Sequence, residues 1–526
     1  MRSVTATRGN TLPGAFGATF PVSEELGILG LLFLAGLLVR FPFVFPALID
    51  WDESTFVLIG QSLVQGHLPY VELWALKPPL AFAFFGLVIA IFGKSLVAVR
   101  LAGTLCVVVT AFLIYLTATR LSNRRVGLVA AILTVATISL LPAGQATMTE
   151  HVALVPLTAA LWLLITQENS VGTSFVVGIL LAVAALVRLN MAYVAILVGL
   201  YVAIGRAGRA PLKAIQCAGA YAAGGGLVVA LTWLPYFLTG EQGLWWTSVV
   251  AAPLNYAGTK SSVYANLIVH STTALGVYKE GGGLRFHGSL LITFVTLATA
   301  GGAVVVARQW RARQDERRGI ELLVLFTTGV GLGILTSGDA YAHHLIQFAP
   351  FAAVLTAMCV DHFAGFVRLG LLLYMGVLTA VSVGPVAAEY RAAMSRARAH
   401  EAMRYGAAYD IAAYLTRENP SRRPVYLMSD HIAYWFADSR PPTRMTAHPS
   451  NIGEQSLIET VVGKDASTSE ELRKVFRLKP EFVVMTERVF YLEREPMRLL
   501  ETILDDEYVL ATQIEGRKIY RVKSAS

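Results

Sequence analysis

Long apolar blocks, separated by short polar or basic segments, cover most of this 526-residue chain. A helix needs about 20 residues to cross the hydrocarbon core of a membrane. Blocks of roughly this length lie at residues 26–48, 96–118, 126–144, 152–166, 172–187, 190–205, 214–238, 288–307, 320–337, 344–360 and 366–386. The pattern predicts a mainly α-helical, polytopic membrane protein with about 11 transmembrane helices.

The apolar run Leu80–Gly93 is shorter than these blocks. A helix of about 14 residues spans only about 21 Å, against about 30 Å of hydrocarbon, so we interpret the run as a helix lying at the membrane interface. The basic loops near residues 120–125, 206–213 and 308–318 then all lie on the inner side. Residues 1–25 become a cytoplasmic tail, and the loops 49–95 and 239–287 lie outside.

From about Ala399 the chain has fewer apolar and more charged residues. The runs "PVYLMSD", "EFVVMT", "EYVLATQI" and "RKIYRV" are typical of strands, and helical patterns near 401–417, 452–462 and 495–505 lie between them. Residues 399–526 are therefore predicted to form a small α/β domain outside the membrane, following a transmembrane domain at 26–390.

Composition supports the membrane assignment, because 55% of the residues are hydrophobic and only 15% are charged. A soluble protein carries roughly 25% charged residues. The net charge of +8 comes largely from short loops between apolar blocks, so it indicates membrane topology rather than nucleic-acid binding. The three cysteines lie in apolar segments and show neither a disulfide framework nor metal-binding spacing.

The acidic pair Asp52-Glu53 directly follows the first apolar block. The pair could be a hydrated helix cap, or it could supply a general base beside an apolar wall. Lys77 precedes Pro78-Pro79, which stiffen the backbone and can aim its ammonium group. A lysine here is either an anchor at the interface or a phosphate ligand.

Arg40, Arg100 and Arg188 lie within or at the ends of apolar segments, where charges are costly and often functional. Arg188 sits in a short outward turn and is the strongest candidate for binding an anion. Arg40 and Arg100 could instead form ion pairs or reach the interface.

Further candidates fall on the same outer face. The motif "TMTEH" brings Glu150 and His151, and "GDAYAHH" brings Tyr341, His343 and His344. Neighbouring histidines on a helix point about 100° apart, which disfavours a metal site, so phosphate or sugar binding and a structural role stay open.

The outer loop 239–287 adds Tyr256 and two tryptophans, either as interface aromatics or as a platform for a sugar or a polyprenyl chain. Gly281–Gly283 in this loop suggests a segment that could order over a substrate.

The ordered set of motifs resembles a known class of enzymes. It comprises "DE" after the first helix, "GHLPY" at 66–70, "KPPL" at 77–80, "FGKSLVAVRLAG" at 92–103, "RLSNRR" at 120–125, "TE" at 149–150 and "HHLIQFAP" at 343–350. Residues 26–210 in particular resemble the GT-C polyprenyl-phosphate-sugar glycosyltransferases. Within that class, the closest resemblance is to the protein O-mannosyltransferases, the aminoarabinose transferase of lipid A and the lipopolysaccharide-core galacturonosyltransferases.

The resemblance implies an inverting sugar transfer outside the cytoplasmic (inner) membrane, from a polyprenyl-phosphate donor to an envelope lipid, polysaccharide or protein. It implies Asp52 as the base with Glu53 beside it, and Lys77 as a phosphate ligand. Arg188 and His344 are further candidates for the phosphate. Glu150, His151, Tyr256, Tyr341 and His343 are candidates for binding acceptor or sugar.

Two points qualify this resemblance. The aminoarabinose transferases have Glu-Lys-Pro where this chain has Leu76-Lys77-Pro78, which argues against the same substrate and against a metal held there. A divalent metal is compatible with the sequence but not required by it.

The alternative function is a multi-pass transporter or flippase, which would place its polar residues near the membrane midplane, often in repeated halves. Here the charges gather at the outer surface.

Overall fold

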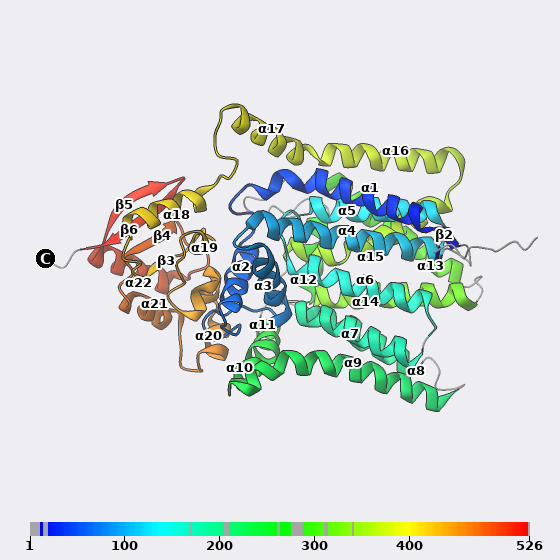
Figure 1. Ribbon diagram of the computed structural model, residues 1–526, viewed down its shortest axis with the longest axis horizontal. Coiled ribbons are helices and arrows are strands. Elements are labelled where there is room, and N and C mark those ends of the chain that lie inside the picture. Colours follow the sequence, from blue (N-terminus) through cyan, green and yellow to red (C-terminus); the bar gives the residue numbers. More distant parts are fainter. Residues whose placement is uncertain are drawn as a thin grey trace, which may run out of the picture.

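A helical bundle carrying a small sheet domain at one end makes up the computed structural model (Figure 1). The structure describes residues 11–13, 19–141, 143–168, 170–204, 210–259, 263–274, 288–309, 314–338 and 341–523. Part of the predicted N-terminal tail and the Gly281–Gly283 segment lie outside these ranges.

Each predicted transmembrane block coincides with a helix of the bundle. These helices are α1 (Val22–Arg40), α4 (Leu96–Leu121), α5 (Arg124–Leu140), α6 (Thr149–Thr166), α7 (Val171–Val187), α8 (Ala192–Ile204), α9 (Pro211–Leu238), α13 (Gly288–Gln309), α14 (Gln314–Leu335), α15 (Ala349–His362) and α16 (Gly365–Ser382). Within the described ranges, six helices are long and apolar enough to cross a membrane, and five others are shorter apolar helices. The predicted fold class, a polytopic α-helical membrane protein, is confirmed.

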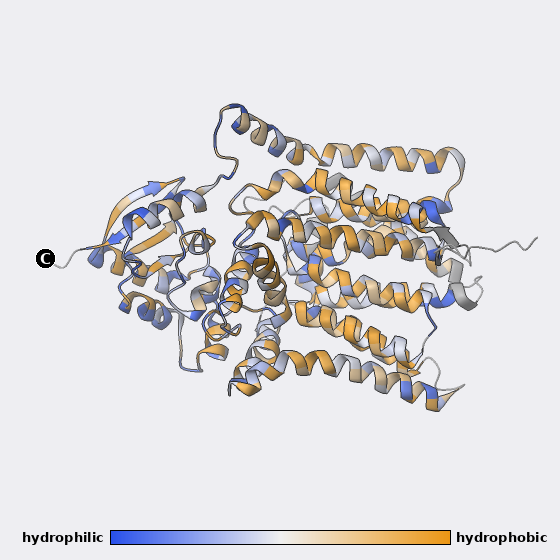
Figure 2. Ribbon diagram, in the orientation of Figure 1, coloured by the Kyte–Doolittle hydropathy of each residue, from blue (hydrophilic) through white to orange (hydrophobic). Residues whose placement is uncertain are grey.

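The distribution of hydropathy follows this division. The bundle helices are predominantly hydrophobic along their lengths, whereas the C-terminal part mixes both kinds of residue (Figure 2). The outward side of the bundle keeps large apolar side chains exposed, as on α16, where Phe366 is 92% and Leu373 62% exposed. Such surfaces are stable against lipid tails but not against water.

The short helices α2 (Trp51–Val64) and α3 (Pro79–Phe92) lie at the end of the bundle next to the C-terminal domain (Figure 1). Before α3, the Trp74 amide donates to the Arg444 carbonyl at 2.9 Å. After α3, the Lys94 ammonium donates to the Trp435 carbonyl at 2.8 Å. The chain therefore enters and leaves α3 on the same side of the bundle, as the interface-helix interpretation requires.

Several shorter elements complete the membrane part and the connection to the C-terminal domain. They are β1 (Thr11–Pro13), β2 (Thr19–Pro21), α10 (Gln242–Trp246), α11 (Ala252–Thr259), α12 (Val263–Ala274) and α17 (Gly384–Arg398). Of these, α10, α11 and α12 fall in the predicted loop 239–287, and α11 contacts α20 of the C-terminal domain.

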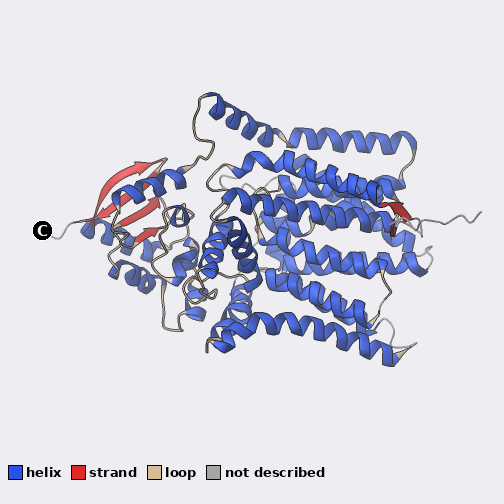
Figure 3. Ribbon diagram, in the orientation of Figure 1, coloured by secondary structure: helices blue, strands red, loops and turns tan. Residues whose placement is uncertain are grey.

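The C-terminal domain has a four-stranded mixed sheet flanked by helices (Figure 3). Its strands β3 (Val425–Leu427), β4 (Phe482–Thr486), β5 (Tyr508–Ile514) and β6 (Arg517–Val522) lie in the order β3-β4-β6-β5. β3 and β4 are parallel, whereas β6 is antiparallel to both of its neighbours. All four strands fall in the runs predicted from the sequence. The helices are α18 (Ala407–Glu418), α19 (Ala433–Phe436), α20 (Gln455–Val461), α21 (Thr468–Arg477) and α22 (Arg494–Glu507).

One buried apolar cluster joins the C-terminal domain to the end of the bundle that carries α2 and α3. Val57 of α2 and Trp74 of the following loop belong to the same cluster as Ile411, Leu427 and Trp435. Burial of apolar surface is worth roughly 25 cal/mol per Å². A continuous core therefore fixes the C-terminal domain on α2 and α3 more strongly than surface ion pairs could.

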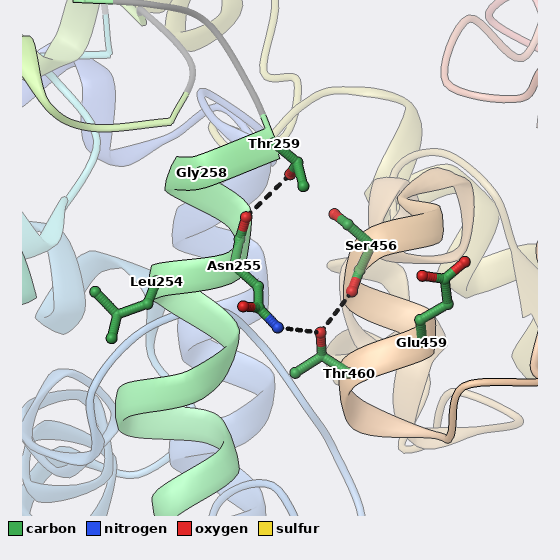
Figure 4. A pocket seen from close by; sticks show the side chains of 7 residues that line it. All are labelled: Leu254, Asn255, Gly258, Thr259, Ser456, Glu459 and Thr460. Carbon is green, nitrogen blue, oxygen red and sulfur yellow. Dashed lines mark hydrogen bonds between the residues drawn. The ribbon is translucent and has the colours of Figure 1, made fainter.

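A groove of ≈ 350 Å³ lies where α11 meets α20 (Figure 4). The Asn255 amide donates to the Thr460 hydroxyl at 3.1 Å and bridges the two helices. The groove is also lined by Leu254, Gly258, Thr259, Ser456 and Glu459. The groove contains none of the predicted site residues. It marks a contact between the loop 239–287 and the C-terminal domain, in addition to the buried cluster that joins this domain to α2.

Candidate active site at the end of the bundle beside the C-terminal domain

The first turn of α2 presents the acidic pair. Asp50 caps this helix, its Oδ1 accepting from the Asp52 amide at 2.8 Å. Carboxylates in a first helical turn are stabilised by the helix dipole. Because successive side chains on a helix point about 100° apart, Asp52 and Glu53 face different surroundings.

Asp52 lies between two cationic or hydrogen-bonding groups. Its Oδ2 is 3.2 Å from the Lys77 ammonium, and its Oδ1 is 3.4 Å from Nε2 of His448. The Asp52 and Lys77 side chains are 21% and 22% exposed, so both are accessible at the protein surface while partly shielded from water. The acidic cluster and the Lys-Pro-Pro motif thus form one site.

The backbone around Lys77 is fixed on both sides, as the proline pair predicts. The Tyr70 hydroxyl donates to the Lys77 carbonyl at 2.6 Å, and the Lys77 amide donates to Ala75 at 2.9 Å. Pro78 is extended, with φ −66° and ψ 159°, and α3 begins at Pro79. The ammonium lies 5.8 Å from the centre of the Phe56 ring, so its position is set by the fold rather than by a free side chain.

Glu53 faces the interior instead. Its carboxylate pairs with Arg100 at 2.7 Å and accepts from the Thr147 amide at 2.6 Å, and both charged side chains are 2% exposed. Arg100 also donates to the Phe43 carbonyl at 2.8 Å. The geometry supports a structural role for Glu53, whose catalytic role was predicted from the acidic pair and from the resemblance of the "DE" motif.

Arg40 is also buried and engaged within the bundle. It donates to the Thr104 hydroxyl at 3.1 Å and to the Ala146 carbonyl at 3.2 Å. Together with Arg100 it ties the start of α4 to the segment preceding α6. These two arginines therefore satisfy backbone carbonyls at the same end of the bundle and do not pair with the accessible carboxylate of Asp52.

A second charged cluster is built from α6, the end of α7 and the segment before α15. Glu150 Oε1 is 3.0 Å from Arg188 Nη2 and 3.7 Å from Nε2 of His343. The Thr149 hydroxyl donates to the other Glu150 oxygen at 3.2 Å and accepts from Arg188 at 3.0 Å. Three predicted residues far apart in the sequence are thus brought together.

Glu150, His343 and His344 could also hold a metal ion, since one ligand atom from each lies within 4.8 Å of the others. However, the Arg188 guanidinium already pairs with the same Glu150 oxygen that faces His343. A divalent cation would place two positive groups on one carboxylate, which Coulomb repulsion disfavours. The arrangement is better suited to hydrogen bonding and to an anion near Arg188.

The remaining predicted residues have different surroundings. Tyr341 is 46% exposed and stacks on His343 with ring centroids 5.4 Å apart. His344 Nδ1 is 3.2 Å from the Ser337 hydroxyl. His151 is buried, and its Nδ1 accepts from the Met148 amide at 3.0 Å, which completes the start of α6.

Tyr256 of α11 packs directly against Gly338, where an added Cβ would lie 2.6 Å from its ring. A glycine at this position lets the outer loop approach the segment that carries Tyr341, His343 and His344. The structure therefore brings Tyr256 to this segment, although it stands in a separate part of the sequence.

Electrostatics distinguish the carboxylates at the accessible site. Burial and the neighbouring Asp52 charge raise the pKa of Asp50 to about 8, so Asp50 carries a proton near neutral pH. Burial alone would also raise the pKa of Asp52, but Lys77 and His448 outweigh it and hold this pKa well below its usual range. Asp52 is therefore the ionised member of the pair.

The two charged clusters influence each other through His343. Burial lowers the pKa of His343, while the charges of Glu150 and Asp52 act in the opposite direction. Arg188 and Lys77 both act to lower it further. Charges from both clusters thus meet at one neutral imidazole.

His448 was missed by the sequence analysis. It lies in the C-terminal domain in "TAHPSN", a stretch that has no periodicity and no motif. His448 lies next to Asp52 only because of how the C-terminal domain docks on the bundle. No local sequence signal could therefore have identified His448 as a site residue.

Comparisons with known proteins agree with this architecture. Residues 76–236 match the family model described as dolichyl-phosphate-mannose-protein mannosyltransferase. That segment includes Lys77, Glu150 and Arg188. No curated protein matches the sequence significantly.

Among solved structures, the fold is similar to ArnT from Cupriavidus metallidurans bound to undecaprenyl phosphate. The TM-score is 0.62 at 12% identity, over 95% of this chain and 97% of that one. ArnT in the apo state gives a TM-score of 0.53 at 13% identity over the same shares. The Archaeoglobus fulgidus oligosaccharyltransferase gives 0.49 at 11% identity, over 88% of this chain and 70% of that one.

The fold and the family match define this chain as a membrane glycosyltransferase of the GT-C class, which confirms the resemblance drawn from its motifs. Within that class, the matching family is that of the dolichyl-phosphate-mannose-protein mannosyltransferases, and the match covers the segment from the Lys-Pro-Pro motif to α9.

Proposed function

We propose that this glycosyltransferase transfers a sugar from a polyprenyl-phosphate donor to a hydroxyl of an envelope lipid, glycan or protein, with inversion at the anomeric carbon. The observation that carries the proposal is the accessible Asp52 carboxylate held 3.2 Å from the Lys77 ammonium at the outer end of the bundle. This pair offers a base and a phosphate ligand at one point.

In the proposed reaction, the acceptor oxygen attacks the anomeric carbon as Asp52 takes the hydroxyl proton. The bond between the anomeric carbon and the phosphate oxygen breaks, and its electrons leave with the polyprenyl phosphate. Lys77 neutralises the charge that develops on this leaving group. The attack from the opposite side of the ring accounts for inversion.

Donor binding would also activate the base. In the structure the Lys77 ammonium pairs with Asp52 and holds its pKa low, which keeps the carboxylate ionised but weakly basic. A donor phosphate that shares this ammonium withdraws part of its charge from Asp52. The pKa of Asp52 then rises, and the carboxylate becomes a stronger base when the sugar is in place.

The Glu150–Arg188 cluster would serve the same site from the opposite wall. Arg188 supplies a second positive charge toward the phosphate, while Glu150 and the Thr149 hydroxyl hold it in place. Tyr341, half-exposed and stacked on His343, offers an aromatic face to a sugar ring. His344 and Tyr256 lie on the segments around it. His151 is buried in the start of α6, so its contribution would be to orient Glu150.

We also propose that this end of the protein faces the outside of the cytoplasmic (inner) membrane. In Figure 1 the far ends of α4, α8 and α13, where the basic loops begin, lie opposite the C-terminal domain. Basic loops favour the cytoplasmic side. In a cysteine-free background, Val71→Cys should react with an impermeant thiol reagent in intact cells, and Arg125→Cys only after permeabilisation. The reverse pattern would contradict this orientation.

The activity itself is tested with purified protein in nanodiscs and polyprenyl-phosphate sugars as donors. Release of polyprenyl phosphate should depend on an envelope acceptor fraction, and the product should carry the inverted anomeric configuration by NMR. Mass spectrometry of envelope glycans from a deletion strain selects the acceptor fraction. Transfer from nucleotide sugars but not from lipid-linked ones would overturn the proposal, as would donor translocation without transfer.

A further inference from the structure

The C-terminal domain places one of its own side chains at the proposed base. Nε2 of His448 lies 3.4 Å from Asp52 Oδ1, on the side of the carboxylate away from Lys77. The His448 side chain is 16% exposed, so it lies between the domain and α2 rather than on the open surface. The two carboxylate oxygens therefore have different partners from different parts of the chain.

The orientation of the His448 ring is set by its surroundings. The Ser450 backbone amide donates to Nδ1 at 3.3 Å, and the Ser450 hydroxyl lies 2.8 Å from the same atom. Because Nδ1 accepts from a backbone amide, the proton of the neutral imidazole lies on Nε2, toward Asp52. The Trp51 ring, 6.0 Å away and edge-on, packs against the imidazole and limits its rotation.

The domain is held firmly enough at this point for such a contact to persist. His431 Nε2 lies 2.9 Å from the Thr55 hydroxyl of α2, and both residues are buried. The Asn451 amide donates to the Trp74 carbonyl at 3.1 Å, in the loop that leads to Lys77. The segments on both sides of His448 are thus anchored to the elements that carry Asp52 and Lys77.

We propose that His448 is a positioning residue for Asp52, by which the C-terminal domain completes the active site; this inference rests on the proposed function. The Nε2–H group holds Oδ1, so that Oδ2 is the oxygen directed at Lys77. When the donor phosphate engages Lys77, Oδ2 is free to accept the proton of the acceptor hydroxyl. Without His448 the carboxylate can rotate, and the oxygen that receives the proton is no longer fixed.

The other ionisable groups near Asp52 come from four places. Lys77 precedes α3, His343 precedes α15, Asp50 caps α2, and His431 lies in the C-terminal domain beside Trp51. A donor hydrogen bond from His448 stabilises the ionised carboxylate relative to the protonated one. Its removal therefore moves the titration of Asp52 to higher pH, whereas these other groups stay in place.

The test compares His448→Ala with His448→Gln in the transfer assay, using a polyprenyl-phosphate sugar that the wild-type protein accepts. His448→Ala should lower kcat by about 10- to 100-fold, as expected when a reacting group is misplaced. Donor affinity should be unchanged, and the acid limb of the kcat profile should move to higher pH. His448→Gln keeps an N–H donor near the position of Nε2 and should recover much of the rate.

Arg440→Ala is the matched control for domain docking. Arg440 pairs with Glu72 at 2.9 Å across the same interface, and its side chain is exposed. It makes no contact with Asp52 among the ion pairs described, so Arg440→Ala should leave kcat and the acid limb of the kcat profile unchanged. Wild-type kcat in His448→Ala would overturn the inference, and so would equal losses in both His448 variants with an unmoved acid limb. If the wild-type protein transfers nothing from lipid-linked donors, the proposed function fails instead.

Discussion

At the residue scale, the central feature is that the Lys77 ammonium group interacts with two anions in the proposed reaction, the Asp52 carboxylate and the donor phosphate. Lys77 pairs with Asp52 in the structure, and in the proposed reaction it binds the donor phosphate. The same contact that keeps Asp52 ionised must be shared for the carboxylate to act as a base. Kinetic measurements on this pair can separate the two roles.

Replacing Lys77 with Ala is expected to weaken donor binding as well as turnover. Loss of a charge-assisted hydrogen bond costs about 1.5–3 kcal/mol, which is about 10- to 100-fold in affinity. Binding of a polyprenyl-phosphate sugar can be measured by tryptophan fluorescence or calorimetry in nanodiscs. Lys77→Arg keeps the charge and serves as the control, with donor affinity expected closer to wild type. Unchanged donor affinity in Lys77→Ala would remove Lys77 from the phosphate site.

The pH profiles should differ between the free and the donor-bound protein. The profile of kcat/KM reports groups in the free enzyme, and that of kcat reports groups in the complex. Lys77 and His448 hold the pKa of Asp52 well below its usual range in the free protein. Sharing Lys77 with a phosphate raises this pKa, so the acid limb of kcat should lie at higher pH than that of kcat/KM. In Lys77→Ala the two acid limbs should coincide. In the wild-type protein, an acid limb of kcat at lower pH than that of kcat/KM would contradict the proposed sharing of Lys77 between Asp52 and the donor phosphate.

Sequence reasoning at this scale succeeded where a motif carries its own geometry. Lys-Pro-Pro predicts a rigid turn, and the lysine indeed faces the acidic cluster. Glu53 shows the limit, because the "DE" motif placed it beside Asp52, whereas the helix turns its side chain toward Arg100. His448 was out of reach, since its role depends on a contact between distant segments.

At the element scale, the crossing of α2 and α3 fixes the distance between Asp52 and Lys77. At this crossing, a Cβ on Gly60 would lie 2.8 Å from the Gly86 amide nitrogen and equally close to Phe85 Cβ. The two backbones therefore touch at a point where only glycine fits. Because Asp52 starts α2 and Lys77 precedes α3, any separation of these helices changes the site.

Gly60→Ala is therefore expected to be costly despite the small change. Overpacking of a tight contact destabilises proteins by about 1–3 kcal/mol. The variant should unfold at lower temperature in detergent and lose at least about 10-fold in transfer rate, by the sensitivity of catalysis to misplacement. Gly30→Ala on α1 is the matched control, because an added Cβ there meets nothing within 4 Å. Equal behaviour of the two variants would show that this crossing does not position the site.

The helices of the membrane part could be read from apolar length, since lipid imposes that pattern on every span. That both ends of α3 lie on the same side of the bundle was also predictable, from a run too short to cross. The meeting of Glu150, Arg188 and His343 was only partly readable. Topology put them on one face, but their contacts depend on how α6, α7 and the segment before α15 pack.

At the scale of the whole molecule, the C-terminal domain packs directly against the proposed active site. Its residues share a buried cluster with α2 and the loop before α3, and it supplies His448 to Asp52. The domain was expected from composition, because its strands and charges differ from the apolar blocks. Its docking surface was not, since apolar residues of a domain core and of a domain interface look alike in sequence.

This shared core predicts that the two parts stay together after the chain is cut. A protease site inserted at the exposed turn between His400 and Glu401 should allow cleavage, and the two fragments should elute together in size-exclusion chromatography with transfer activity retained. Adding Arg440→Ala and Lys94→Ala should not separate them, because exposed ion pairs contribute only about 0–1 kcal/mol each. Separate elution of the fragments after cleavage alone would show that the buried cluster does not hold the domain.

The most direct test of the account is Asp52→Asn, which keeps the size of the side chain but removes the proton acceptor. A positioned base is worth about 100- to 10,000-fold in rate, so single-turnover transfer in nanodiscs should fall by that factor. Binding of the polyprenyl-phosphate sugar, measured separately, should be retained or tighter, because Lys77 loses a competing anion. Near-wild-type transfer by Asp52→Asn would contradict the assignment of Asp52 as the base.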